Sequence, residues 1–306
     1  MKKTIINDKV KENVSTFSFL YNYTNRKDVC HVRFTHTHTT ASDGTFSPSE
    51  LVAYAIEKKL SALAITDHDT IAGLKEAFAA ASNSNLELIP GIEFSTEYKG
   101  KDIHIVGLNI DYDNPFFVEK LERFIDSRDV RNEKMCHLLT EKGLPVTLDE
   151  LKERFPDSVI TRAHFARYLL EQGYITQLET AFTKYIGDNG PCYVAREKVN
   201  PVQAIRLILE AGGIPVLAHP ILYKLPTKEL DELVAYLSKN GLIGIEAIYS
   251  TYNRADEACI RQLAKKYNLH VSGGSDFHGK NKPYIDLGVG RGNLKVPDEV
   301  WANLKQ

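Results

Sequence analysis

The chain has 306 residues, and its 38 Lys and Arg against 40 Asp and Glu leave a formal net charge of −2. The 43% share of hydrophobic residues is ordinary for a globular protein, which excludes a disordered chain, a collagen-like chain and a strongly basic coat protein for nucleic acid. Every apolar run is far shorter than the ~18 residues of a membrane span, and the four cysteines form no CxxC pair. We therefore expect a cytoplasmic protein with no membrane partner and no disulfides.

The first third of the chain predicts an N-terminal extension followed by alternating strands and helices. Residues 1–30 show no clear periodicity, and the first apolar run starts at Val32. A helix is predicted to begin at Ser47-Pro48-Ser49-Glu50, because a serine cap, a proline at the first helical position and a glutamate form a capping box. Hydrophobic patterning then predicts a strand, a helix and two further strands, at 63–66, 71–81, 88–94 and 103–108.

The middle of the chain has a different character. From 112 to 198 it is mostly helical and charged, with helices predicted at 121–139, 149–155 and 161–172. Alternation then resumes with a helix and three strands, at 201–211, 215–218, 243–247 and 271–274. We therefore predict a barrel domain made of 31–111 and 199–306, interrupted by an inserted helical subdomain at 112–198. Repeated βα units predict a parallel sheet, open or closed.

Histidine and acidic residues gather at the predicted strand ends. His36 and His38 end the first apolar run, and residues two apart on a strand face the same side. Asp276 and His278 repeat this spacing after the last strand. Functional groups at the C-terminal ends of several strands are typical of an α/β barrel. The complete set is His36, His38, Asp43, His68, Glu93, His104, His219, Asp276 and His278.

These nine residues predict a centre with two or three divalent metal ions, because one zinc ion takes only three or four ligands. Glu93 is the expected bridge. Imidazole and carboxylate without thiolate suit Mn²⁺, Fe²⁺ or Zn²⁺. Three carboxylates do not neutralise two or three divalent ions, so the loaded site should be net positive and attract a phosphate. Metal ions roughly 3.5–4 Å apart can generate hydroxide at neutral pH, which predicts attack on a phosphate ester without a nucleophilic Ser or Cys.

Each motif alone has an ordinary alternative. The His36-Thr37-His38 pattern alone does not specify a metal site, and Asp69 could simply cap the helix that follows it. His104 could be a core histidine and His219 a turn residue. Because all these positions recur at successive strand ends, the joint pattern favours the metal site.

The motifs resemble those of the polymerase and histidinol phosphatase (PHP) family of metal-dependent phosphoesterases. The resemblance spans Val32 to about Gly290 and is carried by His36–Gly44, Ile65–Thr70, Pro90–Glu93, Asp102–Gly107, Leu217–Pro220 and Gly274–Gly279. It implies a distorted (β/α)7 TIM-like barrel with a three-metal site, Mn²⁺ being the favoured ion, ligated by the same nine residues. The chain departs from the family at Phe34-Thr35, where Asp-Leu is usual, which implies a changed hydrogen bond behind the first metal pair.

The helical insertion resembles that of the stand-alone bacterial members of the family. Those members hydrolyse the 3′-phosphate of nucleoside 3′,5′-bisphosphates or degrade short RNA from the 5′ end. The resemblance therefore implies a nucleotide phosphatase, with a 5′→3′ exonuclease on short RNA as the first alternative. A non-catalytic metal-binding module is the second, and the presence of all nine ligand positions argues against it.

Further residues are expected to contact the substrate. Arg162 and His164 open a predicted helix in a Thr-Arg-Ala-His stretch that resembles the Gly-Arg-Pro-His stretch of this branch. Arg128 lies on the long helix and offers a bidentate fork for a phosphate, although a solvated helix flank is the ordinary alternative. We predict these three as substrate contacts. The proton for the leaving group is expected from Asp43, His219 or a bound water.

Overall fold

The structure is a computed structural model that describes residues 33–34, 36–188, 190–194, 200–292 and 294–306. The N-terminal extension predicted for 1–30 and Thr35 of the Phe34-Thr35 departure lie outside the described residues. The strands are β1 (Arg33–Phe34), β2 (Ala62–Ile65), β3 (Glu87–Tyr98), β4 (Lys101–Leu108), β5 (Ile214–Leu217), β6 (Gly244–Tyr249) and β7 (His270–Gly274). The α-helices are α2 (Pro48–Glu57), α3 (Leu74–Ala81), α4 (Pro115–Glu141), α5 (Leu148–Arg154), α6 (Arg162–Glu171), α7 (Leu178–Ala181), α8 (Pro201–Glu210), α9 (Thr227–Ser238), α10 (Arg254–Lys266) and α11 (Asp298–Leu304). Short helical turns are η1 (Phe182–Ile186), η2 (Pro220–Tyr223) and η3 (Gly279–Asn281).

The strands form one mixed sheet in the order β1 to β7. Neighbours are parallel from β1 to β3 and from β5 to β7, but β4 is antiparallel to both β3 and β5. The expectation of an all-parallel sheet is therefore wrong at β4. Only Lys99 and Gly100 connect β3 to β4, both with positive φ, and such a tight turn makes a hairpin, whereas a parallel pair needs a long crossover.

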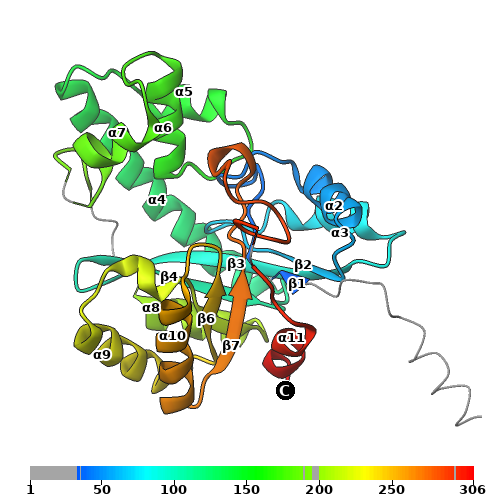
Figure 1. Ribbon diagram of the computed structural model, residues 1–306. Helices are drawn as coiled ribbons and strands as arrows, with labels where there is room; N and C mark the ends of the chain where they lie inside the picture. Colours follow the sequence, from blue (N-terminus) through cyan, green and yellow to red (C-terminus); the bar gives the residue numbers. More distant parts are fainter. Residues whose placement is uncertain (1–32, 35, 189, 195–199, 293) are drawn as a thin grey trace, which may run out of the picture.

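The sheet curls so that its first and last strands meet (Figure 1). Just beyond β1 and β7, Thr37 and Phe277 form a parallel bridge. The His38 N–H donates to the Phe277 carbonyl, and the Asp276 N–H donates to the His36 carbonyl, both at 3.0 Å. The two motifs from opposite ends of the chain are thereby placed side by side.

Two of the helices that cover the sheet, α2 and α8, begin where the sequence predicts. The Ser47 side chain accepts a hydrogen bond from the Glu50 N–H, and Glu50 bonds back, so the predicted capping box of α2 is confirmed. Asn200 caps α8 in the same way, with Pro201 in the first turn. Figure 1 shows α2 and α3 beside one part of the sheet and α8 to α10 below another. This packing leaves the strand ends that carry the histidines facing the remaining helices.

Helix α4 connects the sheet to a group of helices with a hydrophobic core of its own. Near its start, Phe117 and Leu121 pack with the core beneath the sheet. Near its end, Met135 and Leu139 pack with residues of α5, α6 and α7 in a separate cluster. We refer to α5, α6, α7, η1 and the end of α4 as the helical lobe, which stands above the sheet in Figure 1.

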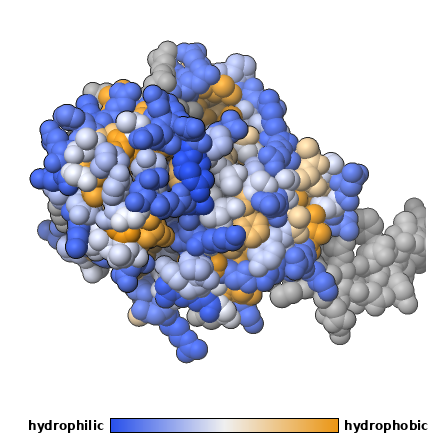
Figure 2. Space-filling view, turned by 90° about the horizontal axis from the view of Figure 1, so that it is seen from above, coloured by the Kyte–Doolittle hydropathy of each residue, from blue (hydrophilic) through white to orange (hydrophobic). Residues whose placement is uncertain are grey.

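Within the described residues, no helix combines the length and the apolar character needed to cross a bilayer. Hydrophilic side chains dominate the face seen in Figure 2, and hydrophobic ones form separate small patches. Among the described residues, Cys136, Cys192 and Cys259 are free thiols.

Candidate metal centre and substrate cavity

The buried carboxylate of Glu93 lies at the centre of the histidine cluster. Its Oε1 is 2.9 Å from His104 Nδ1 and 3.1 Å from His219 Nε2. Its Oε2 lies 3.1–3.2 Å from one ring nitrogen on each of three further residues, His36, His38 and His68. Five imidazoles around one carboxylate form the arrangement that a bridging ligand requires.

Two aspartates complete the cluster. Asp43 Oδ1 is 3.3 Å from His278 Nε2, and Asp276 Oδ1 is 3.3 Å from both His278 Nδ1 and His38 Nε2. All nine residues predicted as ligands therefore meet at one place. Within four overlapping groups, three or four possible ligand atoms lie within 4.8 Å of one another.

The hydrogen bonding of the cluster fits metal ions. Among the described residues, seven buried side-chain atoms of the cluster have no hydrogen-bond partner: His36 Nε2, both ring nitrogens of His38, Asp43 Oδ1, His68 Nδ1, Glu93 Oε2 and His219 Nδ1. Several lie within 4 Å of an opposing nitrogen or oxygen, but without hydrogen-bond geometry. Buried polar atoms normally have a hydrogen-bond partner. Because these atoms converge on shared positions, divalent ions bound there would supply the missing interactions.

The electrostatics also suit cations. Burial would raise the pKa of Glu93, but the charges of His36 and His68 outweigh it and hold the pKa well below its usual range. Burial would lower the pKa of His38, but Asp276 and Glu93 raise it to about 9. The carboxylates thus stay ionised, and positive charge is favoured among them, whether it is a proton or a metal ion.

The backbone is forced into unusual conformations at this site. His219 and Asp276 have φ of 28° and 53°, a region that residues other than glycine seldom occupy. A Cβ on Gly274 would lie 2.5 Å from the His36 Cβ, so only glycine lets β7 approach this histidine. The surrounding structure must therefore hold the cluster in place.

Glu246 is a functional residue that the sequence analysis missed. Its Oε1 is 3.2 Å from His36 Nδ1, and its Oε2 accepts a hydrogen bond from the His219 N–H at 2.8 Å. This contact leaves His36 Nε2 directed at the cluster, and such carboxylate partners orient metal-binding imidazoles. An acidic residue inside the apolar strand β6 was the signal that could have revealed it, since buried carboxylates need a partner.

Asp67 holds the loop that carries two of the cluster residues. Its carboxylate accepts hydrogen bonds from the Thr39 N–H and hydroxyl, both at 2.7 Å, and from the Ser42 hydroxyl at 2.6 Å. This cradle fixes the turn between His38 and Asp43. The sequence analysis placed Asp67 within a motif but gave it no role.

Asp69 does not cap helix α3, which begins at Leu74 with Gly73 at its N-cap position. Its backbone has φ of 54°, and its Oδ1 accepts a hydrogen bond from the Ser95 N–H at 3.0 Å. Its other oxygen pairs with Arg128. The helix-cap alternative is therefore wrong, because the pairing of His68 with Glu93 turns the chain before the helix can start.

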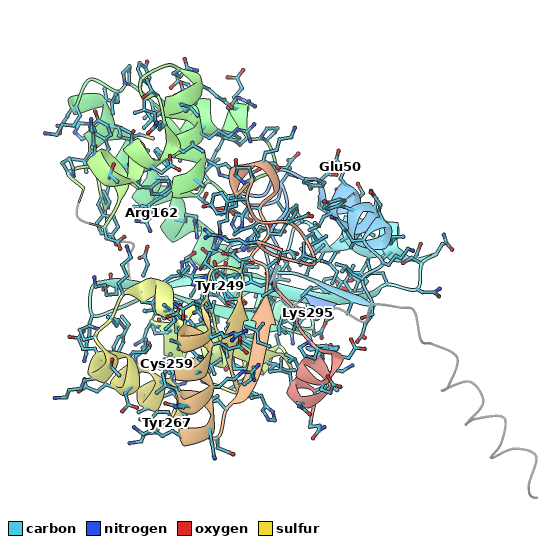
Figure 3. All side chains as sticks on the ribbon, viewed as in Figure 1. Glu50, Arg162, Tyr249, Cys259, Tyr267 and Lys295 are labelled. Atoms are coloured by element: carbon cyan, nitrogen blue, oxygen red, sulfur yellow. The ribbon has the colours of Figure 1, made fainter. Side chains whose placement is uncertain are left out.

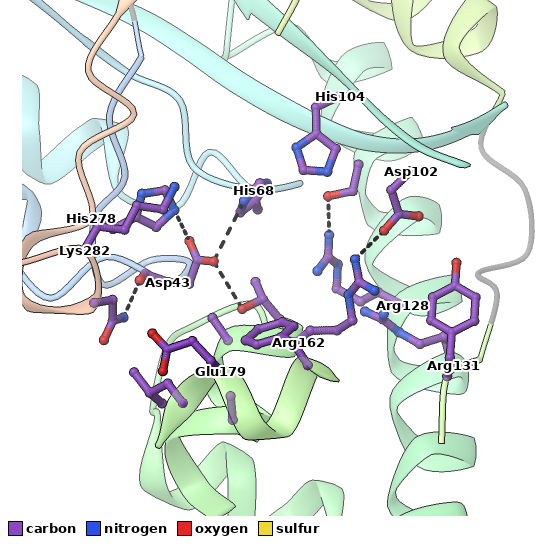
Figure 4. Close-up of a pocket in the computed structure, with 18 of the residues that line it drawn as sticks. Asp43, His68, Asp102, His104, Arg128, Arg131, Arg162, Glu179, His278 and Lys282 are labelled. Carbon is purple, nitrogen blue, oxygen red and sulfur yellow. Dashed lines mark hydrogen bonds and ion pairs between the residues drawn. The ribbon is translucent and has the colours of Figure 1, made fainter. Parts of the chain in front are cut away.

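A cavity of about 510 Å³ opens between the cluster and the helical lobe. Asp43, His68, His104 and His278 line one side, as Figure 4 shows in part. The cationic residues that line it are Arg128, Arg131, Arg162, Lys280 and Lys282. Three aromatic side chains also line it, namely Phe182, Tyr193 and Tyr284. This volume and lining suit a ligand the size of a nucleotide.

The three predicted substrate contacts occupy different positions. Arg162 lies where the helical lobe meets the sheet (Figure 3) and pairs with Asp102 at 2.5 Å and Asp188 at 2.9 Å. Arg128 is almost fully buried, and its Nη2 also donates to Ser95 at 2.9 Å. His164 is buried behind the cavity wall, where its Nδ1 accepts from the Thr161 N–H and its ring packs on Phe155. Only the two arginines line the cavity.

The helical lobe contacts the loop of Asp43 directly. The Val159 N–H donates to the Ala41 carbonyl at 3.0 Å, and the Thr161 hydroxyl lies 3.4 Å from Asp43 Oδ2. The segment before α6 therefore sets the position of Arg162 relative to the cluster.

Comparison with known proteins agrees with this site. The PHP domain model matches residues 35–268, which is more than half of the chain. The chain belongs to the PHP family. It is 38% identical to the 5′-3′ exoribonuclease Rnm of Escherichia coli, over 83% of this chain and 87% of that protein. It is 31% identical to the 3′,5′-nucleoside bisphosphate phosphatase of Chromobacterium violaceum, over 88% and 95%.

A solved structure of another family member extends the likeness to the fold. The protein from Bifidobacterium adolescentis, assigned as a metal-dependent phosphoesterase, superposes with a TM-score of 0.78. It is 27% identical to this chain and covers 90% of it, with 95% of its own length matched. This PHP protein is accordingly a metal-dependent phosphoesterase.

Proposed function

We propose that the protein hydrolyses the 3′-phosphate of nucleoside 3′,5′-bisphosphates. One observation carries this assignment: a single cavity has the histidine and carboxylate cluster on one side and three arginines on the other. A phosphoryl group at the cluster would be cleaved while a second phosphate of the same molecule binds an arginine. Arginine forks bind phosphate oxygens in pairs, which makes the second phosphate a selective handle.

The nine cluster residues are proposed to hold two or three divalent metal ions, with Mn²⁺ favoured over Fe²⁺ and Zn²⁺. When bound, such ions stabilise the phosphoryl charge and supply hydroxide at neutral pH. Glu93 would bridge them, because both of its oxygens contact imidazoles. We also propose that the curled sheet is a distorted (β/α)7 barrel built from 31–111 and 199–306, with 112–198 inserted as a helical subdomain.

The chain's own residues would then bind the substrate and handle its proton. Asp43 lines the cavity, so its carboxylate can reach the leaving 3′ oxygen, whereas His219 Nε2 lies against Glu93. Burial would raise the pKa of Asp43, but the neighbouring imidazoles hold it well below its usual range, so the carboxylate is ionised. We therefore assign Asp43 to take a proton from the attacking water and pass it to the leaving 3′ oxygen, with His219 in a supporting role. Arg162 is proposed to bind the 5′-phosphate, and Arg128 to fix Ser95 and Asp69 beside it. His164 would position Thr161 and the start of α6.

A 5′→3′ exonuclease acting on short RNA is the second candidate. The Escherichia coli relative carries that name, and aromatic residues that line the cavity suit stacking on bases. Both reactions can break the same bond between phosphorus and a 3′ oxygen with the 5′-phosphate as the handle. They differ in whether a further nucleoside is attached to that phosphorus.

The test compares substrates on the manganese-loaded protein. We expect phosphate release from adenosine 3′,5′-bisphosphate, with a kcat/KM at least about tenfold above that for adenosine 3′-monophosphate, since a lost charge-assisted hydrogen bond costs about that much. Short 5′-phosphorylated RNAs are assayed in parallel at two salt concentrations. Higher kcat/KM on RNA than on the bisphosphate would favour the exonuclease. No release from any ester by metal-loaded protein would contradict both candidates.

A further inference from the structure

Lys282 places an ammonium group beside the cluster and at the cavity. Its Nζ is 2.6 Å from Asp276 Oδ2, and its side chain is 30% exposed. It lines the cavity together with Asp43 and His278 (Figure 4). Lys282 is therefore the cation that directly contacts a cluster carboxylate and still reaches the cavity.

The two oxygens of Asp276 have separate neighbours. Oδ1 faces His38 and His278, each at 3.3 Å, while Oδ2 accepts the Tyr249 hydroxyl and the Lys282 ammonium, each at 2.6 Å. Oδ1 thus belongs to the proposed metal centre, and Oδ2 holds Lys282. An ammonium has three donors, so the contact with Oδ2 leaves others for a ligand in the cavity.

The loop that carries Lys282 is fixed to the loop of Asp43. The Asn281 side-chain amide donates to the Asp43 carbonyl at 2.7 Å, and the Lys280 N–H donates to the Thr45 hydroxyl at 2.8 Å. Close packing explains Gly279, where φ is 63° and a Cβ would lie 2.2 Å from Thr45 Oγ1. The ammonium is consequently held at a set place relative to the cluster.

Lys282 adds one positive charge at the edge of the cluster. Asp43, Glu93, Asp276 and Glu246 are four carboxylates, and Lys282 is the one ammonium that an ion pair joins to them among the described residues. Lysine is charged at neutral pH and binds phosphate as a point charge. Charge that develops on phosphoryl oxygens during displacement is best stabilised by donors already in position.

We propose that Lys282 binds a non-bridging oxygen of the phosphoryl group that is cleaved, as a catalytic residue supplied by the chain itself. The proposal rests on the proposed function, because it needs that group to lie over the cluster. The competing interpretation is that Lys282 only neutralises Asp276 and has no contact with the substrate.

The experiment compares Lys282→Met and Lys282→Arg with Lys295→Met in the full-length, metal-loaded protein. Lys295 is the control, since it is an exposed lysine that does not line the cavity. Three quantities are measured: bound metal by elemental analysis, binding of inorganic phosphate by calorimetry, and kcat and KM for adenosine 3′,5′-bisphosphate.

We expect Lys282→Met to keep the wild-type metal content, to bind phosphate about tenfold more weakly and to lose about 10²-fold in kcat. Lys282→Arg should recover part of both losses, and Lys295→Met should change each by less than about threefold. Unchanged phosphate binding in Lys282→Met would overturn the proposal. The proposal would also be overturned if the losses of phosphate binding and kcat disappeared once the metal content of the variant was restored to the wild-type level.

Phosphate binding separates this proposal from the proposed function. If Lys282→Met weakens phosphate binding but the wild-type protein cleaves no ester, Lys282 binds phosphate without a catalytic role and the proposed function is wrong. If the wild-type protein cleaves the bisphosphate and Lys282→Met is fully active, the function stands and the lysine proposal is wrong.

Discussion

The two sides of the cavity are built from different kinds of structure. On the side of the sheet, most cluster residues follow strand ends, while Glu93 and His104 lie within β3 and β4. They are mostly buried and are held by contacts such as those of Glu246 and Asp67. On the side of the helical lobe, Arg162 lies on the first turn of a helix and is held by ion pairs with Asp102 and Asp188, which come from distant segments. Hydrogen bonds such as that from the Val159 N–H to the Ala41 carbonyl join the two sides.

This difference suggests a division of labour. The sheet side has little freedom, because displacing one carboxylate leaves several imidazoles without a partner in a buried site. On the lobe side, a substrate meets side chains that are exposed or whose ion-pair partners it can replace. Changes in the cluster should therefore abolish metal binding and turnover together, whereas changes in the lobe should alter which phosphate ester is preferred.

The largest effect is expected from Glu93→Gln. The variant keeps the shape of the side chain but removes the charge that five imidazoles surround. Removing one partner of a buried charged pair costs about 3–5 kcal/mol, so we expect about a 10³-fold loss of kcat/KM together with loss of bound metal. Elemental analysis and phosphate release from adenosine 3′,5′-bisphosphate measure the two effects.

Glu97→Gln is the matched control for Glu93→Gln. Glu97 lies on the same strand and lines the cavity, and its Oε1 accepts a hydrogen bond from the Gly100 N–H. It should retain wild-type metal content. A Glu93→Gln protein with full metal content and activity would remove Glu93 from the metal centre.

A smaller effect is expected from Glu246→Gln. Glutamine still fills the space beside His36, but it no longer stabilises the imidazole with a negative charge. Losing such a partner typically weakens metal binding by about 10–100-fold. Metal titration checks this, with Glu257→Gln as a control that makes the same charge change at the exposed ion pair with Arg261. Equal metal affinity in Glu246→Gln and the wild type would show that the contact only packs β6 against the cluster.

The sheet side could be predicted from sequence because the spacing of residues along single strands determines where most of its side chains lie. Residues such as His36 and His38 follow a strand, so their spacing alone places them on one face. Glu246 escaped prediction because its partners, His36 and His219, are far away in sequence, and a lone acid in an apolar strand does not identify them. The antiparallel direction of β4 also escaped, since apolar runs do not record strand direction.

The lobe side was harder to predict for the same physical reason. Arg162 and His164 open one helix, yet one lines the cavity and the other lies behind it. That difference depends on how α6 packs against Phe155 and against the loop of Asp43. Helical spacing predicts on which face of a helix a residue lies. Which part of the protein packs against that face depends on contacts between segments that are far apart in the sequence.

Arg162→Met tests the lobe side directly. We expect KM for adenosine 3′,5′-bisphosphate to rise at least about tenfold, because a hydrogen bond to a charged group contributes about 1.5–3 kcal/mol. KM for adenosine 3′-monophosphate should hardly change, since it lacks the 5′-phosphate. Arg167→Met is the control, being on the same helix in an ion pair with Glu171. An equal rise for both substrates would place the contribution of Arg162 in the fold of the lobe instead of in binding.

The smallest effect on activity is expected from His164→Asn, which should act on stability alone. Burial lowers the pKa of His164 to about 4, so the folded protein keeps this imidazole neutral. The unfolded chain takes up a proton near pH 6.5, so the stability that His164 contributes is complete above that pH and is lost as the pH falls toward 4. The loss amounts to at most about 3 kcal/mol.

Asparagine can still accept the Thr161 N–H but does not titrate. The wild type should be more stable than His164→Asn at pH 7, because the ring packs on Phe155, and this advantage should shrink as the pH falls to 4. Urea unfolding of both proteins at several pH values measures the difference, in which contributions from the metal centre cancel. If the difference does not vary with pH, His164 is not buried in its neutral form. If kcat for the bisphosphate falls in His164→Asn at pH 7, the histidine is one of the substrate contacts. The part of the lobe that contacts the substrate would then extend beyond Arg162 to His164.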